Sequence, residues 1–532
     1  MPTDSLCRVT TSNCGSRTLA TILALSSLLA MAGSCRTREY SSSETVGKTG
    51  PQRYVTPIHQ VLTPTGVQVD LPGMRPQALA LSPDGRLLAV SGKTQDLVLI
   101  DPKTGEIKQR VALPSGELLD PNDVSSHILK PDKSGQLSFT GLVFSPDGSR
   151  IYLSNVKGDI KVFGVGPQGE VTGLPPIALP AANAPWRKEE IPAGLAISRD
   201  GRRLYAALNL SNRLAEIDTT TGDVLRLWQV GFAPYDVVLA GNKAYVSNWG
   251  GRVPDKDSLT GPAGQGTRVR VDPVRHIASE GSVSVVPLAE ESSVREIMVG
   301  LHSSGMAGSP NGRYVVVTNA GSDTLSVIDT RSDEVVETIW AKPKPSDLFG
   351  ASPNALVFHP SGDTLYVANG TQNAIAVFRF RPDESKLLGL IPVGWFPGAV
   401  LHDAPRRQLV VANIKGVGST RSLKDASANE YNSHQYHGTL SLVPVPKAKE
   451  LPKLTGRVQE NYRYPLLKEA AKPARANQPA RPVPERVGEP SVFEHVVYII
   501  KENRTYDQVL GDVPEGRSEE RRVGKECIAV WR

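Results

Sequence analysis

The sequence contains very little cysteine. Its 532 residues include four cysteines, and none of them lies between residues 36 and 526. A disulfide framework and a cysteine-based zinc site are therefore both excluded from the body of the chain. Aromatic residues are also sparse, at 6%, whereas glycine and proline are frequent, at 48 and 42 residues. Many turn residues between short apolar runs favour an all-β repeat fold.

The body of the chain also lacks an excess of either charge. The formal net charge is +6, but residues 447–489 alone hold ten basic and five acidic side chains, and residues 517–532 hold five and three. The remaining residues are close to neutral. A nucleic-acid partner is therefore not expected, because proteins that bind nucleic acids carry a basic surface. The basic stretch is interpreted as a solvated connector.

Only one long apolar run stands out near the N-terminus, from Leu19 to Met31. It is shorter than the roughly 20 residues that a membrane-spanning helix needs. Two arginines precede it, as in the basic start of a secretory signal peptide. Residues 1–35 are therefore predicted to be a signal peptide and residues 36–54 a flexible segment. The protein is expected to be exported to the periplasm or the cell surface.

Small residues before Cys35 resemble the cleavage motif of bacterial lipoproteins, in which the cysteine is lipidated and becomes the mature N-terminus. Ala32 stands where that motif usually has leucine. Lipoproteins carry several acyl chains, which are enough for stable membrane attachment. Two alternatives remain open: lipidation of Cys35 with attachment to a membrane, or ordinary cleavage that leaves Cys35 without a role.

Self-similar units fill residues 55–445. Each unit reads as three short apolar strands joined by tight turns. The clearest turns read Ser-Pro-Asp-Gly, in which proline presets φ and glycine accepts a positive φ. The recognisable starts of the seven units lie at residues 78–85, 141–148, 194–201, 234–242, 309–312, 359–362 and 400–404. One unit cannot bury both of its faces, whereas units stacked around a ring can. The repeats therefore predict a seven-bladed β-propeller.

Three strand ends resemble the signature of the YVTN family of β-propellers, which includes YncE-like proteins: Tyr245–Asn248, Val316–Asn319 and Tyr366–Asn369. The resemblance extends over about three-quarters of the chain and implies the fold. It names no ligand, because propellers host unrelated functions. A protein, a glycan or a small molecule is each a possible partner of the propeller.

Two insertions interrupt the repeats. Gly251–Glu280 contains His276, and Gly418–Tyr436 contains His434. Inserted loops often form binding surfaces, and the alternative is a solvated loop without function. The other histidines are scattered, and the repeats show neither a His-x-x-x-His spacing nor a carboxylate cluster. No metal site and no cofactor are expected in the propeller.

The repeat pattern ends at residue 445. Residues 446–490 are rich in proline, lysine and alanine, and predict an extended linker. An apolar run typical of a buried parallel strand follows at Phe493–Ile500. Polar residues come directly after it, where open α/β sheets place their ligands. Glu502 and Asn503 could hold a divalent metal or a phosphoryl oxygen, and a helix N-terminus with local caps is the alternative.

The string from His495 to Gln508 closely resembles the opening strand of the phosphoesterase family. That family belongs to the alkaline-phosphatase-like superfamily and includes phospholipases C and acid phosphatases. The resemblance implies metal-dependent hydrolysis of a phosphate-ester substrate, with Glu502 and Asn503 at the site of a divalent metal. Residues 55–516 resemble proteins that join a YVTN propeller to this domain.

The resemblance ends near Gly516, so residues 491–516 correspond to the start of a truncated α/β phosphoesterase domain. Members of the superfamily carry their Ser or Thr nucleophile and further metal ligands downstream. No catalytic nucleophile is therefore expected in this sequence, and residues 517–532 are interpreted as translated adapter sequence.

Two functions remain open. The first is an exported phosphoesterase whose propeller binds its substrate or a partner, with this chain as an inactive fragment. The second is a non-catalytic propeller that binds a ligand outside the cytoplasm. A quinone-dependent oxidoreductase has no supporting residues beyond the fold.

Overall fold

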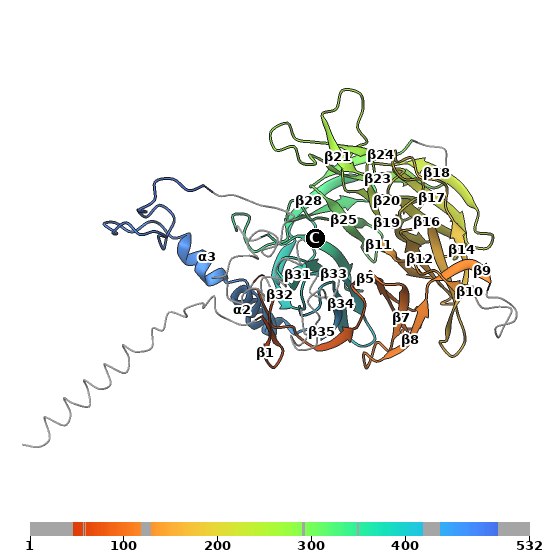
Figure 1. Ribbon diagram of the computed structural model, residues 1–532, viewed down its shortest axis with the longest axis horizontal. Helices are drawn as coiled ribbons and strands as arrows, with labels where there is room; N and C mark the ends of the chain where they lie inside the picture. The colour runs from red at the N-terminus through yellow and green to blue at the C-terminus, as the bar shows by residue number, and fades with distance from the viewer. Residues whose placement is uncertain are drawn as a thin grey trace, which may run out of the picture. The chain divides into compact units, whose positions relative to one another are not determined.

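The chain folds as a seven-bladed β-propeller, as the repeats predict (Figure 1). The computed structural model describes residues 46–497 except 57, 59, 119–128, 290–292, 348–349 and 419–436. Within these residues, seven antiparallel sheets each hold four strands. Each sheet is one blade, and the blades are numbered here by the position of their innermost strand along the chain.

The first four blades follow one another along the chain, with one inserted hairpin between blades 1 and 2 and another within blade 4. Blade 1 consists of β5 (Pro76–Leu81), β6 (Leu88–Gly92), β7 (Asp96–Ile100) and β8 (Ile107–Ala112). Blade 2 consists of β11 (Leu137–Phe144), β12 (Arg150–Asn155), β13 (Asp159–Val165) and β14 (Val171–Ala178). Blade 3 consists of β15 (Pro192–Ile197), β16 (Arg203–Leu208), β17 (Arg213–Asp218) and β18 (Val224–Gln229). Blade 4 consists of β19 (Pro234–Ala240), β20 (Lys243–Asn248), β23 (Gly281–Pro287) and β24 (Arg295–Val299).

The last three blades complete the ring. Blade 5 consists of β25 (Ser303–Gly308), β26 (Tyr314–Asn319), β27 (Thr324–Asp329) and β28 (Glu334–Trp340). Blade 6 consists of β29 (Pro353–Phe358), β30 (Thr364–Asn369), β31 (Ala374–Arg379) and β32 (Lys386–Pro392). Blade 7 consists of β33 (Pro397–Asp403), β34 (Gln408–Asn413), β35 (Gly438–Pro444) and β4 (Val67–Leu71).

Blade 7 takes its strands from both ends of the propeller. Its outer strand β4 precedes blade 1 in the sequence and pairs with β35, from Leu71 opposite Gly438 to Val67 opposite Leu442. The innermost strands of successive blades also contact one another around the ring, and β33 of blade 7 contacts β5 of blade 1. The pairing of β4 with β35 therefore holds the last blade beside the first.

The middle strands of each blade are buried on both faces, which is why they read as continuous apolar runs. The fourth strand is different, because its side chains alternate between half-buried and exposed positions, as in β8. The exposed positions of the outer strands accept polar residues, such as Lys108 and Arg110 in β8. The prediction of three strands in each repeat was therefore incomplete, since it missed this outer strand.

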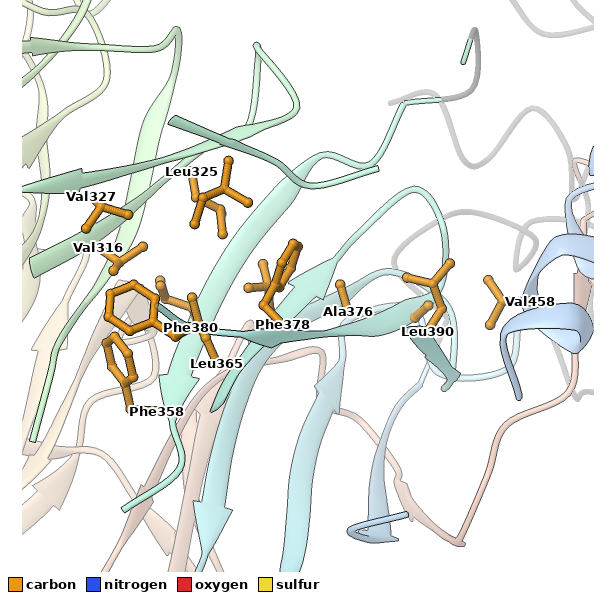
Figure 2. Close-up of a cluster of buried hydrophobic side chains, with 14 of the residues drawn as sticks. Val316, Leu325, Val327, Phe358, Leu365, Ala376, Phe378, Phe380, Leu390 and Val458 are labelled. Carbon is orange, nitrogen blue, oxygen red and sulfur yellow. The ribbon is translucent and has the colours of Figure 1, made fainter. Parts of the chain in front are cut away.

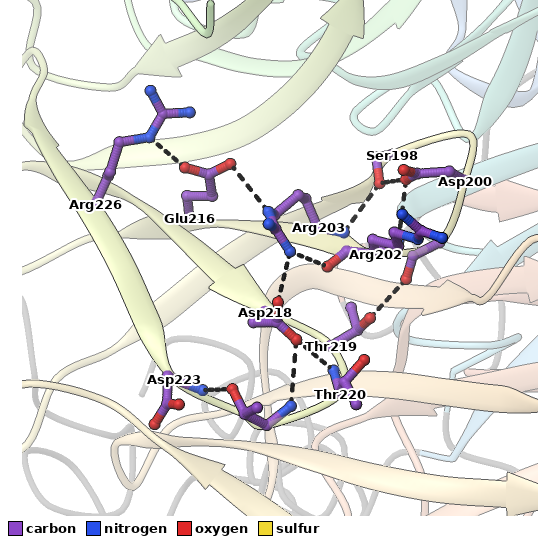
Figure 3. Close-up of polar contacts among 12 residues, drawn as sticks. Ser198, Asp200, Arg202, Arg203, Glu216, Asp218, Thr219, Thr220, Asp223 and Arg226 are labelled. Atoms are coloured by element: carbon purple, nitrogen blue, oxygen red, sulfur yellow. Dashed lines mark hydrogen bonds and ion pairs between the residues drawn. The ribbon is translucent and has the colours of Figure 1, made fainter.

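The Ser-Pro-Asp-Gly turns are held by their own side chains, and Figure 3 shows the related turn of blade 3. The Ser198 hydroxyl donates to Asp200 Oδ1 at 2.5 Å and accepts the Arg203 N–H at 3.0 Å. Gly201 adopts a φ of 72°, which favours glycine. The same arrangement recurs in blade 1, where hydrogen bonds from Ser82 and Arg86 lower the pKa of Asp84 to about 2.

Helices replace the predicted extended linker over residues 448–470. The helical turn η4 (Ala448–Glu450) leads into α2 (Leu451–Asn461), and α3 (Tyr464–Ala470) follows. Val458 of α2 is fully buried and packs beside Leu390 of blade 6 (Figure 2). Gly389 leaves room for the helix, since a Cβ there would lie 2.7 Å from Thr455 Oγ1. The prediction of an extended conformation is wrong here, because the apolar side chains of α2 are spaced for a helix among the prolines and lysines that suggested a linker.

Three smaller elements lie outside the blades. They are the sheet of β1 (Gly47–Gly50), β2 (Arg53–Val55) and β3 (Val61–Leu62), the hairpin of β9 (Pro114–Leu118) and β10 (Leu129–Pro131), and the hairpin of β21 (Thr260–Gly264) and β22 (Thr267–Arg270). Residues 47–50 and 53–54 thus form strands within the segment predicted to be flexible. Leu62 packs on Trp395, which ties this small sheet to the propeller. Among the described residues, no helix has the length and apolar character to span a membrane.

Replacing Leu71 by alanine should weaken ring closure. Leu71 is 0% exposed in β4, whereas Val67 at the other end of the same strand is 57% exposed. The Leu71→Ala variant should lose about 2–5 kcal/mol of unfolding free energy, because it leaves a cavity between blades 7 and 1. The matched Val67→Ala variant should stay within about 0.5 kcal/mol of wild type. Urea unfolding followed by circular dichroism measures both, and equal losses would contradict the closure by β4.

Candidate functional site

Most of the residues singled out by the sequence lie outside the described part of the chain. These are Cys35, His434, Glu502 and Asn503. Lipidation and metal binding at these positions therefore stay predictions. Within the described ranges, no three or more His, Cys, Asp and Glu side chains are grouped so that they could hold a metal ion.

The inner strands begin with an irregularity that redirects their side chains. In β19 the register shifts between Pro234 and Asp236, and β5, β29 and β33 show the same shift after their first proline. The residue before the strand has a positive φ in blades 4 to 7, namely Ala233, His302, Ser352 and Phe396. Bulges and such backbone angles are common beside functional sites. The end of the ring where the inner strands begin is called the mouth below.

Four aromatic rings gather at the mouth. Tyr235 and Trp249 are stacked with their centroids 4.7 Å apart, and Phe139 meets both edge-on at 5.4 and 4.8 Å. His302 meets the Trp249 ring edge-on at 4.8 Å. Phe139, Tyr235 and Trp249 are half-buried and His302 is exposed. Phe139, Tyr235, Trp249 and His302, from blades 2, 4 and 5, are called the aromatic cluster.

A carboxyl group lies directly beside the aromatic cluster. Asp236 Oδ2 accepts the Met306 N–H at 2.9 Å, and Oδ1 accepts the Val237 N–H at 2.9 Å and the Thr140 hydroxyl at 3.5 Å. Burial raises the pKa of Asp236 to about 6, although these hydrogen bonds act in the opposite direction. Asp236 can therefore exist in both its charged and its neutral form near neutral pH.

Bare backbone from blade 3 makes room for Asp236. A Cβ added to Gly194 would lie 2.6 Å from Asp236 Oδ1 and equally close to its Cα. Any side chain at position 194 would therefore displace the carboxyl group. At this position blade 3 has a glycine, which leaves space for the carboxyl group, whereas blades 2, 4 and 5 supply the side chains of the aromatic cluster.

Two further groups at the aromatic cluster can form hydrogen bonds. Although His302 is exposed at its surface, desolvation by the groups packed around its ring lowers the pKa of its imidazole, so the neutral form, with one donor and one acceptor, predominates at pH 7. Trp249 Nε1 donates to Ser304 Oγ at 3.3 Å, which fixes the indole ring. The arrangement offers flat rings and hydrogen-bonding groups, a combination suited to binding.

The first insertion forms a hairpin beside the aromatic cluster. Val269 of β22 and Val271 pack on Phe232, which precedes β19 by two residues. The tip of the hairpin reaches the loop before β15, where the Trp186 N–H donates to Gln265 O at 3.1 Å. The insertion Gly251–Glu280 therefore has defined structure. Of the second insertion, residues 419–436 lie outside the described part.

Comparisons with known proteins agree with this fold. The family described as "Lactonase, 7-bladed beta-propeller" matches residues 278–395. That stretch includes His302 but neither Tyr235 nor Trp249. No curated protein matches the chain.

Two solved structures are similar to this chain at low sequence identity. The WD40 repeats of RRP9 superpose with a TM-score of 0.50 at 12% identity, covering 71% of this chain and 97% of that one. The hydrazine synthase of Kuenenia stuttgartiensis gives a TM-score of 0.47 at 16% identity, covering 65% and 94%. At these identities the first likeness shows a propeller fold and nothing of function.

The sequence did not point to the aromatic cluster as a site. Trp249 follows the signature Tyr245–Asn248 directly, so its place at the end of a strand was visible. Tyr235 and Asp236 fall in the repeat whose turn is most degenerate. A degenerate repeat is a usable signal, because positions that bind ligands depart from the pattern that packing requires.

The Asp236→Asn variant should change how stability depends on pH. The folded pKa of about 6 lies above the ordinary value of 3.8, so the folded state holds the proton more tightly. The stabilisation of the folded state by this tighter proton binding is fully present below about pH 4 and is lost as the pH rises to about 6. The difference in unfolding free energy between wild type and variant should fall by about 2 kcal/mol across that window. Urea titrations at pH 4, 5, 6 and 7 measure it, and a constant difference would contradict the raised pKa.

Proposed function

We propose that this protein is an exported binding protein whose propeller takes up a small ligand at the aromatic cluster, and that the ligand is a sugar or a short glycan. The observation that carries the proposal is the partly exposed stack of Tyr235 and Trp249 beside Asp236. Export is supported by the signal-peptide pattern of residues 1–35.

Sugars match the chemistry of the aromatic cluster. Their C–H faces pack on aromatic rings, which bury large apolar area in a defined orientation. Their hydroxyl groups donate to a carboxylate, and Asp236 is such an acceptor when it is ionised. His302 adds a neutral donor and acceptor beside the same rings. A ligand with one apolar face and several hydroxyl groups would use all three.

Binding suits the aromatic cluster better than catalysis. Catalysis by a nucleophile needs a hydroxyl or thiol within hydrogen-bond reach of a base. The hydroxyl of Ser304 donates to the backbone oxygen of His302 at 2.9 Å and accepts from Trp249. The hydroxyl of Thr140 reaches Asp236 Oδ1 only at 3.5 Å, longer than the roughly 2.6–3.2 Å between a nucleophile and its base. Asp236 accepts two backbone N–H groups. Ser304 thus holds the indole ring in place, and Asp236, which as a carboxylate has about four acceptor positions, keeps capacity for a ligand hydroxyl group.

The second candidate function is phosphate-ester hydrolysis by a neighbouring domain. Residues His495–Gln508 favour it, through their resemblance to the opening strand of the phosphoesterase family. In such a protein the propeller would hold the substrate or a partner near a metal site to which Glu502 and Asn503 contribute. A phosphorylated glycan would unite both functions.

Replacing Trp249 by alanine should weaken sugar binding. A titration of intrinsic tryptophan fluorescence with a panel of monosaccharides and oligosaccharides measures the affinity. The Trp249→Ala variant should bind about tenfold more weakly, which corresponds to about 1.4 kcal/mol. Trp340 is the matched control, because it is 43% exposed on the outer strand β28 and lies outside the cluster. Unchanged affinity in Trp249→Ala, or an equal loss in Trp340→Ala, would refute the proposed site.

The second function is tested with a longer form of this protein in which the phosphoesterase domain continues after residue 516. We expect that form to contain a Ser or Thr nucleophile and further His and Asp metal ligands after residue 516. It should hydrolyse p-nitrophenyl phosphate only with a divalent metal. Glu502→Gln should lower the rate at least about tenfold, whereas Glu494→Gln, before the motif, should not. Equal rates in both variants would contradict a metal site at Glu502.

A further inference from the structure

A lysine at the mouth, in blade 7, has an unusual environment. Lys415 follows β34, and its N–H donates to Trp395 O at 3.1 Å, while the Ile414 N–H donates to Phe396 O at 3.1 Å. Its ammonium group lies 4.8 Å from the centre of the Trp395 ring and 5.6 Å from that of Phe396. Aromatic faces attract a cation but supply no negative charge to balance it.

Other lysines with partly or fully buried side chains form ion pairs. The other lysines with little exposed side chain in the propeller pair with aspartates: Lys161 with Asp132 at 2.8 Å and Asp159 at 2.9 Å, Lys243 with Asp333 at 2.7 Å, and Lys342 with Asp323 at 3.3 Å. Lys415 is half-buried, and no carboxylate of the described residues forms an ion pair with it. Partial burial of a charge without a counter-charge is costly, so an anion bound beside Lys415 would be stabilised.

Other cations increase the positive potential at this place. Burial lowers the pKa of Lys415, and the nearby charge of Arg75 lowers it further. The pKa of Lys93 is lowered in the same way, first by burial and then by Arg75. A negative charge close to Lys415 would offset this repulsion.

An amide donor without an acceptor lies beside the same Phe396 ring. Asn354 Nδ2 is buried and has no hydrogen-bond acceptor within the described residues. A Cβ added to Gly370 would lie 2.5 Å from Asn354 Nδ2 and 2.9 Å from Phe396 Cζ, so the amide and the ring are neighbours. A buried donor without an acceptor is expensive, which points to a ligand oxygen or a water there.

We infer that Lys415 and Asn354 form a site at the mouth for the acid group of a small anion, a phosphate or a carboxylate. The Trp395 and Phe396 rings form its apolar walls. The site lies in blades 6 and 7, whereas the aromatic cluster lies in blades 2, 4 and 5. The inference therefore stands or falls independently of sugar binding.

Calorimetric titration at low ionic strength with inorganic phosphate and, separately, with acetate tests the site. Wild type should bind at least one of the two, and the stronger one identifies the acid group. Lys415→Met should weaken this binding at least tenfold, and Lys415→Arg should keep it within threefold. The control Lys386→Met should bind like wild type, because Lys386 is exposed on the outer strand β32. Lack of binding by wild type, or equal binding by Lys415→Met, would overturn the inference.

Differential labelling of wild type keeps the test valid if Lys415→Met does not fold. An amine-reactive reagent should modify Lys415 more slowly in the presence of the anion, while Lys386 reacts at the same rate with and without it. Mass spectrometry of the peptides that contain Lys415 and Lys386 measures, for each lysine, the ratio of labelling with and without the anion. Equal labelling of Lys415 under both conditions would also overturn the inference.

Discussion

The pairing of β4 with β35 is the constraint on which the rest of the molecule depends. Each blade buries its apolar faces only against its neighbours, so an open row of seven would leave the faces at both ends exposed. Closure buries those faces between blades 7 and 1, where Leu71, Leu88, Val90, Val410 and Leu440 share one apolar cluster. The strand that closes the ring comes from before blade 1, so the two ends of the propeller fold together.

Closure also explains the position of the proposed sites. The inner strands all begin at the same end of the ring, so the irregular backbone at their starts converges there. Blades 4 and 7 share one local design, in which Asn248 and Asn413 each donate to two hydroxyl groups of the neighbouring strand. On this common frame blade 4 carries Trp249, and blade 7 carries Lys415. The same scaffold thus presents an aromatic group and a cation at separate places on one surface.

Much of the fold could be predicted from the sequence, because packing repeats it. The turn Ser82-Pro-Asp-Gly85 and its relatives mark the blades, since the same side-chain hydrogen bonds are needed each time. The outer strands escaped prediction because their exposed positions accept polar residues. Helix α2 escaped because the prolines and lysines around Leu451 and Val458 obscured a helical spacing. Both failures occurred where packing constrains only one side of an element.

The sites could be predicted far less well. The aromatic cluster joins Phe139, Tyr235, Trp249 and His302, which come from three different blades and meet only through the arrangement of those blades in the ring. Lys415 is likewise defined by the rings beside it and by the lack of a carboxylate partner among the described residues, which no local pattern records. Motifs within one segment, such as that of the resemblance to phosphoesterases, were visible because their residues are contiguous.

Hydrogen–deuterium exchange, read by mass spectrometry, tests the closed ring most directly. The account predicts that the amides of β4 and β35 exchange together, as slowly as those of the inner strands, because opening this pair requires the ring to unfold. Exchange of β4 within seconds, with β35 and the inner strands still protected, would contradict it.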